Sequence, residues 1–210
     1  MGGISLTTMR PRRRPGLEDY ARSAIGLSSS MLVGIQIGRV IERRRMLKNA
    51  AAIALTDPLT GLANRRAWEE ELRREVARAK RTSNRLALVM LDLDHFKQLN
   101  DTQGHQAGDT VLAEAAASWR TAVRTTDFLA RYGGDEFAML LPDCPSEYGE
   151  TVLERIRTAI PPGCSASAGI AYWDGTETAE ALLSRADAAL YEAKRAGRNM
   201  AVTAGGAPRD

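Results

Sequence analysis

The chain has 210 residues, of which 44% are hydrophobic and 26% are charged, and its formal net charge is +3. This composition is that of a folded globular protein with one domain and an extension, and it excludes a disordered chain. The small net charge gives no reason to expect a nucleic-acid partner. The two cysteines, Cys144 and Cys164, form no CxxC pair. The sequence therefore argues against a zinc site or a disulfide framework, and for a reducing, cytoplasmic compartment.

The start of the chain differs in composition from the rest. Residues 1–16 hold four arginines and two prolines, which is typical of a disordered basic tail. Residues 23–38 are uncharged and mostly apolar. As a helix this stretch would be about 24 Å long, which is short of the roughly 30 Å hydrocarbon core of a membrane. We therefore expect it to pack on a partner, and membrane association is the less favoured alternative.

Residues 33–55 are predicted to form one helix that ends before Pro58. Apolar residues recur at every seventh position, namely Val33, Val40, Leu47 and Ala54. Arg44 interrupts the second apolar row, so the coiled-coil pattern is short. We predict that residues 17–56 form an N-terminal helical extension that pairs two subunits.

Residues 57–203 alternate between helical and strand patterns and are predicted to form a single core. Helices are expected from Asn64 to residues 82–84, around 112–123, over 147–159 and from about 182 to Gly197. Strands are expected over 86–91, on both sides of residues 133–134 and over 165–172. Residues 100–105 are expected to form a loop. This order predicts an α/β (α+β) fold with a mixed sheet flanked by helices. Residues 204–210 are predicted to be a disordered tail.

The segment Arg131-Tyr132-Gly133-Gly134-Asp135-Glu136-Phe137 is predicted to be the turn of a hairpin, because apolar runs flank it on both sides. The two glycines suit the positive φ of a short hairpin turn. Asp135 and Glu136 then lie at the tip, beside residues without side chains that would block a ligand. Such a tip suits a metal ion and a phosphate, and the alternative is a plain hairpin with a charged turn.

Asp92 and Asp94 follow the predicted central strand, at the strand end where ligands gather in α/β sheets. Together with the hairpin carboxylates they would make an oxygen-rich site, which suits Mg²⁺ working with substrate phosphates. The alternative is that one of the two aspartates only caps the turn that follows.

Cationic and polar residues surround these carboxylates in the sequence. Lys97 and the cations of the segment Lys194-Arg195-Ala196-Gly197-Arg198-Asn199 would neutralise a triphosphate if the sheet brings them to the site. The alternative is that the cations near the end of the last helix only interact with the helix dipole. Asn100 and Asp109 carry groups able to bind a base edge. Alternatively, Asn100 is a turn residue and Asp109 caps its helix.

Taken together, these segments resemble the GGDEF family of diguanylate cyclases. The resemblance rests on five motifs in order, namely residues 57–66 (DPLTGLANRR), 92–101 (DLDHFKQLND), 104–109 (GHQAGD), 131–137 (RYGGDEF) and 189–199 (ALYEAKRAGRN). It covers about residues 53–203. Ala63, where proline is common in the family, is a mild departure.

The resemblance implies a fold similar to the palm of nucleotidyl cyclases. It also implies that two such domains, each holding one GTP, face each other in a homodimer and form cyclic di-GMP and two pyrophosphates. For the metal, the resemblance implies that Asp92, Asp135 and the Leu93 carbonyl bind Mg²⁺, or Mn²⁺ as the alternative, and that Glu136 contributes to metal binding or to acid–base chemistry. Asp135 would also assist deprotonation of the attacking hydroxyl. For the nucleotide, it implies close approach at Gly133 and Gly134, guanine binding by Asn100 and Asp109, and phosphate binding by Lys97, Lys194 and Arg198.

A second implied site is the RxxD sequence Arg124-Thr125-Thr126-Asp127. In the family this sequence binds the product and inhibits the enzyme, and Arg155 on the following helix would complete the pocket. The alternative is a surface salt bridge between Arg124 and Asp127. We therefore predict an active diguanylate cyclase with product feedback. The other possibilities are a non-catalytic cyclic di-GMP receptor and a membrane-tethered signalling scaffold.

Overall fold

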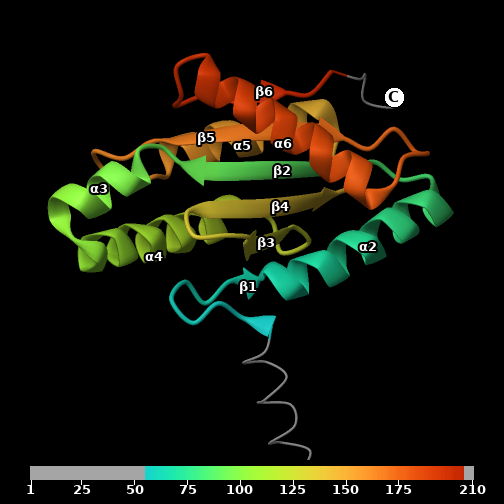
Figure 1. Ribbon diagram of the computed structural model, residues 1–210. Coiled ribbons are helices and arrows are strands. Elements are labelled where there is room, and N and C mark those ends of the chain that lie inside the picture. Colours follow the sequence, from blue (N-terminus) through green and yellow to red (C-terminus); the bar gives the residue numbers. More distant parts are fainter. Residues whose placement is uncertain (1–54, 206–210) are drawn as a thin grey trace, which may run out of the picture. The chain divides into compact units, whose positions relative to one another are not determined.

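The computed structural model describes residues 55–205 (Figure 1). The expectations for the basic tail, for residues 17–54 of the extension and for residues 206–210 lie outside the described residues. Between residues 55 and 205, no helix has both the length and the hydrophobicity that a membrane crossing needs.

The domain is a mixed sheet with helices on both faces. Its elements in chain order are β1 (Ala63–Asn64), α2 (Arg65–Thr82), β2 (Leu86–Leu93), α3 (Phe96–Gln103), α4 (His105–Ala122), β3 (Phe128–Arg131), β4 (Glu136–Pro142), α5 (Ser146–Thr158), β5 (Ala166–Tyr172), α6 (Ala179–Arg195) and β6 (Ala201–Thr203). The strands lie in the order β1-β3-β4-β2-β5-β6. The predicted fold class and mixed sheet are confirmed.

Strand β2 is the centre of this sheet. All its residues are buried, and it pairs antiparallel with both β4 and β5. The unbroken apolar run predicted such a strand, because neither face meets water. Since both neighbours run antiparallel to β2, the end of β2 lies beside the starts of β4 and β5. Helix α3 lies at the same end of the domain (Figure 1).

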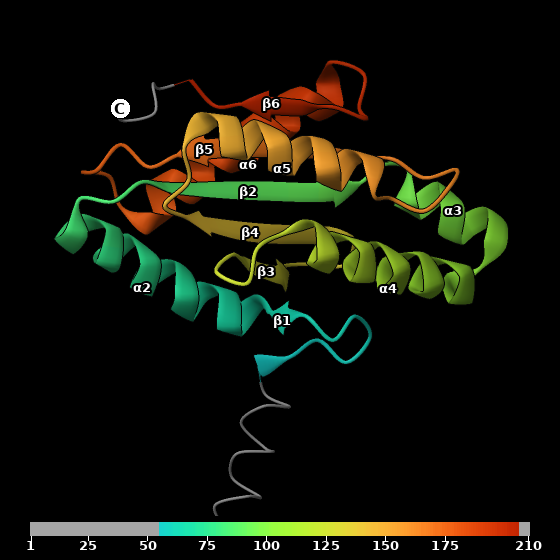
Figure 2. The same ribbon diagram turned by 180° about the vertical axis from the view of Figure 1, so that it is seen from behind.

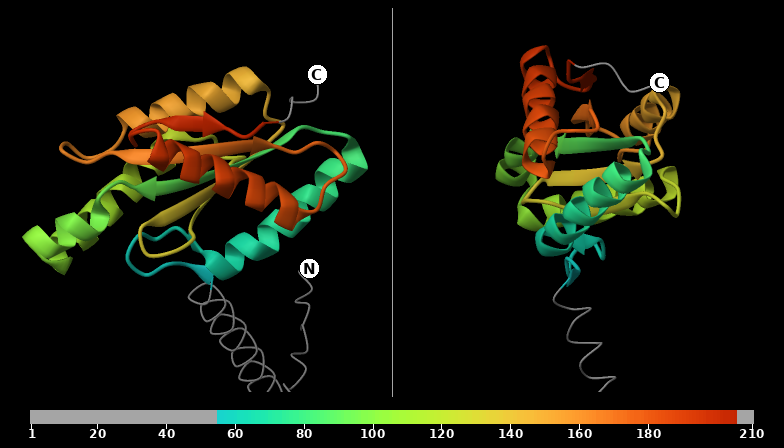
Figure 3. Two further views of the ribbon diagram at one scale, coloured as in Figure 1. Left: turned by 45° about the horizontal axis from the view of Figure 1, so that its top comes forward. Right: turned by 90° about the vertical axis from the view of Figure 1, so that its right-hand side faces the viewer.

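The two faces of the sheet carry separate hydrophobic cores. Helices α2 and α6 cover one face, and α4 and α5 cover the other (Figures 1 and 2). Viewed from the side, α5 and α6 lie on opposite sides of the sheet (Figure 3). In β2, Leu88 and Met90 join the core under α2 and α6, while Val89 and Leu91 join the other one. Because side chains alternate along a strand, Asp92 belongs to the α6 face.

Helix α2 follows its predicted pattern, since Trp68 and Leu72 are buried and the Asn64 side chain caps its first turn. The expected loop at residues 100–105 is wrong. That segment is the end of α3 and the start of α4, separated by Gly104 alone, whose φ is +86°. Helix α3 has only eight residues and none of them is fully buried, so its apolar pattern is too short to predict a helix.

The structure also contains the short edge strands β1 and β6, which the sequence analysis did not predict. Strand β1 runs parallel to β3, and β6 runs parallel to β5. They have two and three residues, which is too short for a periodic pattern.

We expect Gly169→Ala to destabilise the domain. A Cβ at Gly169 would lie 2.2 Å from the Ala186 carbonyl oxygen and 2.2 Å from the Leu190 nitrogen, which are backbone atoms of α6 that have little room to move. Overpacking of this kind costs about 1–3 kcal/mol, and each kcal/mol lowers the melting temperature of a domain of this size by about 2–4 °C. Thermal unfolding measures the loss. Gly134→Ala is the control, because its Cβ would meet nothing within 4 Å. Equal melting temperatures for the two variants would contradict the prediction.

Candidate active site

Two carboxylates lie opposite each other at the end of the central strand. Asp92 of β2 pairs in register with Glu136, the first residue of β4. On β4, Ala138 and Leu140 belong to the core under α2 and α6, so Glu136 continues the same face. Like charges directly opposite in a sheet repel each other. This end of the sheet therefore carries concentrated negative charge.

Lys194 partly neutralises this charge from α6. Its Nζ lies 2.7 Å from Asp92 Oδ2, and Asp92 is only 7% exposed. Burial raises the pKa of Asp92 to about 6; Lys194 opposes this shift, while Asp135 and Glu136 add to it. The carboxylate of Asp92 is thus destabilised, and a further cation would stabilise it.

Asp94 has a structural role. Its carboxylate accepts hydrogen bonds from the hydroxyl groups of Ser165 and Ser167, at 2.7 Å each, and from the Asn199 backbone N–H at 2.9 Å. With these partners Asp94 joins the end of β2 to the segment that follows α6. The alternative in which an aspartate caps the turn after β2 does not describe Asp94, because these partners lie 71 to 105 residues further along the chain.

The hairpin tip between β3 and β4 is closed by backbone bonds, since Tyr132 and Gly133 both donate to the Glu136 carbonyl, at 2.8 and 3.0 Å. The expectation of positive φ at Gly133 and Gly134 is wrong, because neither residue adopts it. Gly133 is needed for another reason: a Cβ there would lie 2.4 Å from Glu136 Oε2. The glycine makes room for the carboxylate, and Gly134 borders open space.

Arg131 clamps this tip, a function that the sequence analysis did not assign to it. Its Nε and Nη2 donate to the Gly134 carbonyl, at 3.1 and 2.7 Å, and its Nη1 lies 3.2 Å from both carboxylate oxygens of Asp57. Burial acts to raise the pKa of Asp57, but the hydrogen bonds from Thr60 and Arg131 outweigh it and lower the pKa. The Leu93 N–H also donates to the Asp135 carbonyl at 3.2 Å, which joins the tip to β2.

Asn100 and Asp109 lie on the adjoining helices α3 and α4. The Asn100 side chain packs against buried Gly108, where a Cβ would lie only 1.9 Å from its Oδ1. Within the described part of the chain this buried Oδ1 has no hydrogen-bond partner. A buried acceptor without a partner is costly, so Asn100 offers an oxygen ready for an external donor. Asp109, the residue after Gly108, is exposed.

The predicted cations are not all brought to the carboxylates. Lys194 contacts Asp92, whereas Lys97 and Arg198 are exposed and form no ion pair within residues 55–205. Arg198 follows α6 with a φ of +66°.

The donor set fits a hard cation that keeps other ligands. Over residues 55–205, no three His, Cys, Asp or Glu side chains converge to hold a metal ion by themselves. Mg²⁺ is usually held by one or two carboxylates, with water and substrate phosphates as its remaining ligands. Asp92, buried beside like charges and with a raised pKa, is a suitable ligand of this kind.

Comparison with known proteins identifies the family of the chain. The family model described as "Diguanylate cyclase, GGDEF domain" matches residues 54–200. The chain belongs to the GGDEF domain family. It is 51% identical over 156 residues to diguanylate cyclase DgcP of Pseudomonas aeruginosa, and this match covers 70% of this chain and 23% of DgcP. It is 40% identical over 186 residues to the probable diguanylate cyclase DgcE of Escherichia coli, covering 80% of this chain and 17% of that protein.

A solved structure is similar as well. The coiled coil and GGDEF domain of DgcB from Caulobacter crescentus, crystallised with c-di-GMP, is 36% identical and superposes with a TM-score of 0.80. The match covers 84% of this chain and all of that one. By contrast, the chain spans less than a quarter of the length of DgcP and DgcE.

The RxxD segment of this GGDEF domain lies between α4 and β3. No side-chain ion pair joins Arg124 and Asp127 in the described part of the chain, so the simple salt-bridge alternative is wrong. Instead the Arg124 backbone N–H donates to Asp127 Oδ2 at 2.8 Å. Both residues line a cavity of about 390 Å³, together with Arg120 of α4. Arg155 is exposed on α5.

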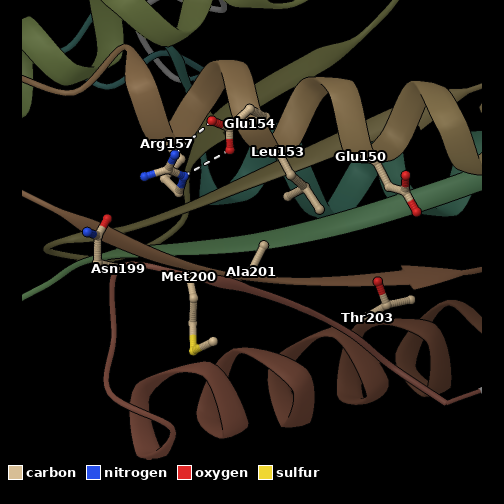
Figure 4. A pocket seen from close by; sticks show the side chains of 8 residues that line it. All are labelled: Glu150, Leu153, Glu154, Arg157, Asn199, Met200, Ala201 and Thr203. Atoms are coloured by element: carbon tan, nitrogen blue, oxygen red, sulfur yellow. Dashed lines mark hydrogen bonds and ion pairs between the residues drawn. The ribbon is translucent and has the colours of Figure 1, made fainter.

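A second cavity, of about 350 Å³, lies between α5 and the β6 edge (Figure 4). The Glu154–Arg157 ion pair and the Thr203 side chain are among the groups that line it. None of the residues predicted to bind metal, nucleotide or product lines this cavity.

Sequence reasoning missed three residues that shape the two predicted sites: Arg131, Gly108 and Tyr148. Arg131 lies inside the recognised motif, but its partner Asp57 is 74 residues away. Gly108 also lies inside a motif, and its need to be glycine depends on the path of α3. Tyr148 matches no motif and has no local signal.

In a chelating buffer, we expect Asp92→Asn to stabilise the domain. The folded pKa of about 6 lies above the ordinary value of 3.8, so the folded state binds the proton more tightly than the unfolded state. The wild type therefore loses stability as the pH rises from about 4 to about 6, and the variant does not. Above pH 7 the variant should be more stable by on the order of 1–3 kcal/mol.

Urea unfolding at several pH values measures this difference, which should vanish below about pH 4. Asp187→Asn, an exposed site on α6, is the control. A less stable Asp92→Asn variant at pH 8 would refute the electrostatic account.

Proposed function

We propose that this GGDEF domain is a diguanylate cyclase that joins two GTP molecules into cyclic di-GMP and releases two pyrophosphates. The observation that carries the proposal is buried Asp92, set opposite Glu136 and 2.7 Å from Lys194. Such a site gains stability from a divalent cation bound with phosphates. The names of the relatives DgcP and DgcE support the same activity.

Asp92 and Asp135 would hold Mg²⁺, or Mn²⁺ in its place, with the Leu93 carbonyl and Glu136 as further ligands. When bound, the metal would neutralise charge on the phosphates and favour ionisation of the attacking hydroxyl. Asp135 would take the proton of the 3′-hydroxyl. The 3′-oxygen then forms a bond to the α-phosphorus of the facing GTP, and the bond from that phosphorus to the β-phosphate oxygen breaks, so that pyrophosphate leaves.

The phosphate and base contacts follow from the same residues. When GTP binds, Lys194 would leave Asp92 and contact phosphate oxygens instead. Lys97 and Arg198 would contact the phosphates as well. Asn100 Oδ1 would accept from the guanine amino group, and Asp109 would accept from the neighbouring N–H groups of the base.

The site on one chain holds one GTP, so catalysis would require two chains facing each other. Gly133 and Gly134 would let the hairpin approach the nucleotide closely. The heptad pattern of residues 33–55 and the coiled coil in the DgcB structure support a dimer formed through the N-terminal extension. We propose a cytoplasmic homodimer.

We further propose that the product inhibits the enzyme at the RxxD segment. Arg124 would bind phosphate or guanine edges, and Asp127 would accept from guanine amino groups. Arg155 would add a second cation. The cavity beside Arg124 and Asp127, and the c-di-GMP in the DgcB crystal, support this proposal.

A direct assay tests the activity. We expect the purified full chain with GTP and Mg²⁺ to form a product with the mass of cyclic di-GMP. Asp135→Ala should lower the rate by at least about a hundredfold, since it removes the proton acceptor and a metal ligand. Asp187→Ala on α6 should keep the wild-type rate. No cyclic di-GMP at any protein concentration, or full turnover by Asp135→Ala, would overturn the proposal.

Gly108→Ala tests the guanine contact. Its Cβ would lie 1.9 Å from Asn100 Oδ1 and 3.1 Å from the Phe96 ring, so the asparagine must move. We expect the KM for GTP to rise by about tenfold, which corresponds to the loss of one good contact. Steady-state kinetics measure the change, with the exposed Thr110→Ala on α4 as the control. An unchanged KM would show that Asn100 does not bind the substrate.

A further inference from the structure

Tyr148, in the first turn of α5, contacts both ends of the RxxD segment. The Arg124 guanidinium carbon lies 3.3 Å from the centre of the Tyr148 ring, and the Tyr148 hydroxyl donates to Asp127 Oδ2. The tyrosine is 7% exposed, whereas Arg124 is exposed at the surface. One buried side chain therefore holds two side chains that would bind the ligand.

The contact fixes the Asp127 carboxylate. Its Oδ2 accepts from the Tyr148 hydroxyl and from the Arg124 backbone N–H at 2.8 Å. Its Oδ1 is buried and, among the described residues, has no hydrogen-bond partner. One carboxylate oxygen is thus held in place, and the other has unused acceptor capacity in a residue that lines the cavity.

The contact also orders Arg124. A guanidinium stacked face-on against an aromatic ring keeps its N–H donors free at the edge of its plane. Stacking therefore reduces the freedom of a long surface side chain without using its donors. Binding a ligand to an ordered side chain costs less entropy than binding to a mobile one.

We propose that Tyr148 is the positioning residue of the RxxD site, where it pre-organises the Arg124 donor and the Asp127 acceptor for cyclic di-GMP. This inference rests on the product-binding function proposed above. The ligand must pair with a guanidinium and also donate to a carboxylate, which the phosphates and guanine edges of cyclic di-GMP do together.

The hydroxyl of Tyr148 remains a donor at physiological pH. Burial and the hydrogen bond to Asp127 raise the pKa of Tyr148 to about 12. Tyr172 provides a matched control, because its buried hydroxyl donates to the Ser146 carbonyl of the same helix at 3.2 Å. Within residues 55–205 it forms no hydrogen bond or ring contact with the RxxD segment.

Calorimetric titration with cyclic di-GMP tests the proposal. The full chain is freed of bound product, and its active site is blocked with a non-hydrolysable GTP analogue. Arg124→Ala should lose most of the affinity. Tyr148→Phe keeps the ring but not the donor, so its affinity should fall by about tenfold. Tyr148→Leu, which also lacks the ring, should bind more weakly still, and Tyr172→Phe should bind as the wild type does.

Stronger binding by Tyr148→Phe than by Tyr148→Leu would separate a positioning role from a role in folding. Thermal unfolding of each variant checks that it is folded. Wild-type affinity in Tyr148→Phe, with loss in Arg124→Ala, would overturn the inference and leave the inhibitory site standing. Equal losses in Tyr148→Phe and Tyr172→Phe would reduce Tyr148 to a structural residue and also overturn it. Wild-type affinity in Arg124→Ala would overturn both the inhibitory site and the inference.

Discussion

The candidate active site depends on an unfavourable pairing at the end of the central strand. The register of β2 with β4 sets Asp92 opposite Glu136, and burial raises the pKa of Asp92 to about 6. The apolar pairs behind them fix this register, because a shift by one residue would turn every side chain to the other face. Lys194 relieves the repulsion only in part. The hydrophobic core thus holds charges together that would otherwise separate, which fits the proposal that the site binds a cation.

Polar bonds between distant segments keep the site in place. Asp94 joins the end of β2 to the residues after α6, and Arg131 joins the hairpin tip to Asp57 at the start of the domain. Both bonds link segments that are far apart in the sequence, and the bond of Arg131 ties the hairpin tip to the first turn of the domain. A tip held in this way fits the proposal that it aligns a nucleotide for attack, because alignment requires little freedom.

The sequence predicted the parts whose signals are local. The unbroken apolar run of β2 and the helical spacing of the apolar residues in α2 predicted these two elements, and the structure confirms both. Helix α3 escaped prediction because it has only eight residues and none of them is fully buried. The expected reason for Gly133 was wrong because the space it provides is for Glu136, which only the folded turn brings near. Tyr148 shows the same limit, since its two contacts arise only when α5 packs beside the RxxD segment.

The proposal that Asp92 binds the metal is tested most directly by the effect of Mg²⁺ on binding of a non-hydrolysable GTP analogue. In the wild type, Mg²⁺ should raise the affinity by about tenfold or more, because the cation relieves the repulsion at Asp92. In Asp92→Asn, which has no such repulsion to relieve, Mg²⁺ should add little. An equal gain of affinity in both proteins would show that the buried Asp92 carboxylate is not the metal ligand, and it would contradict the proposed active site.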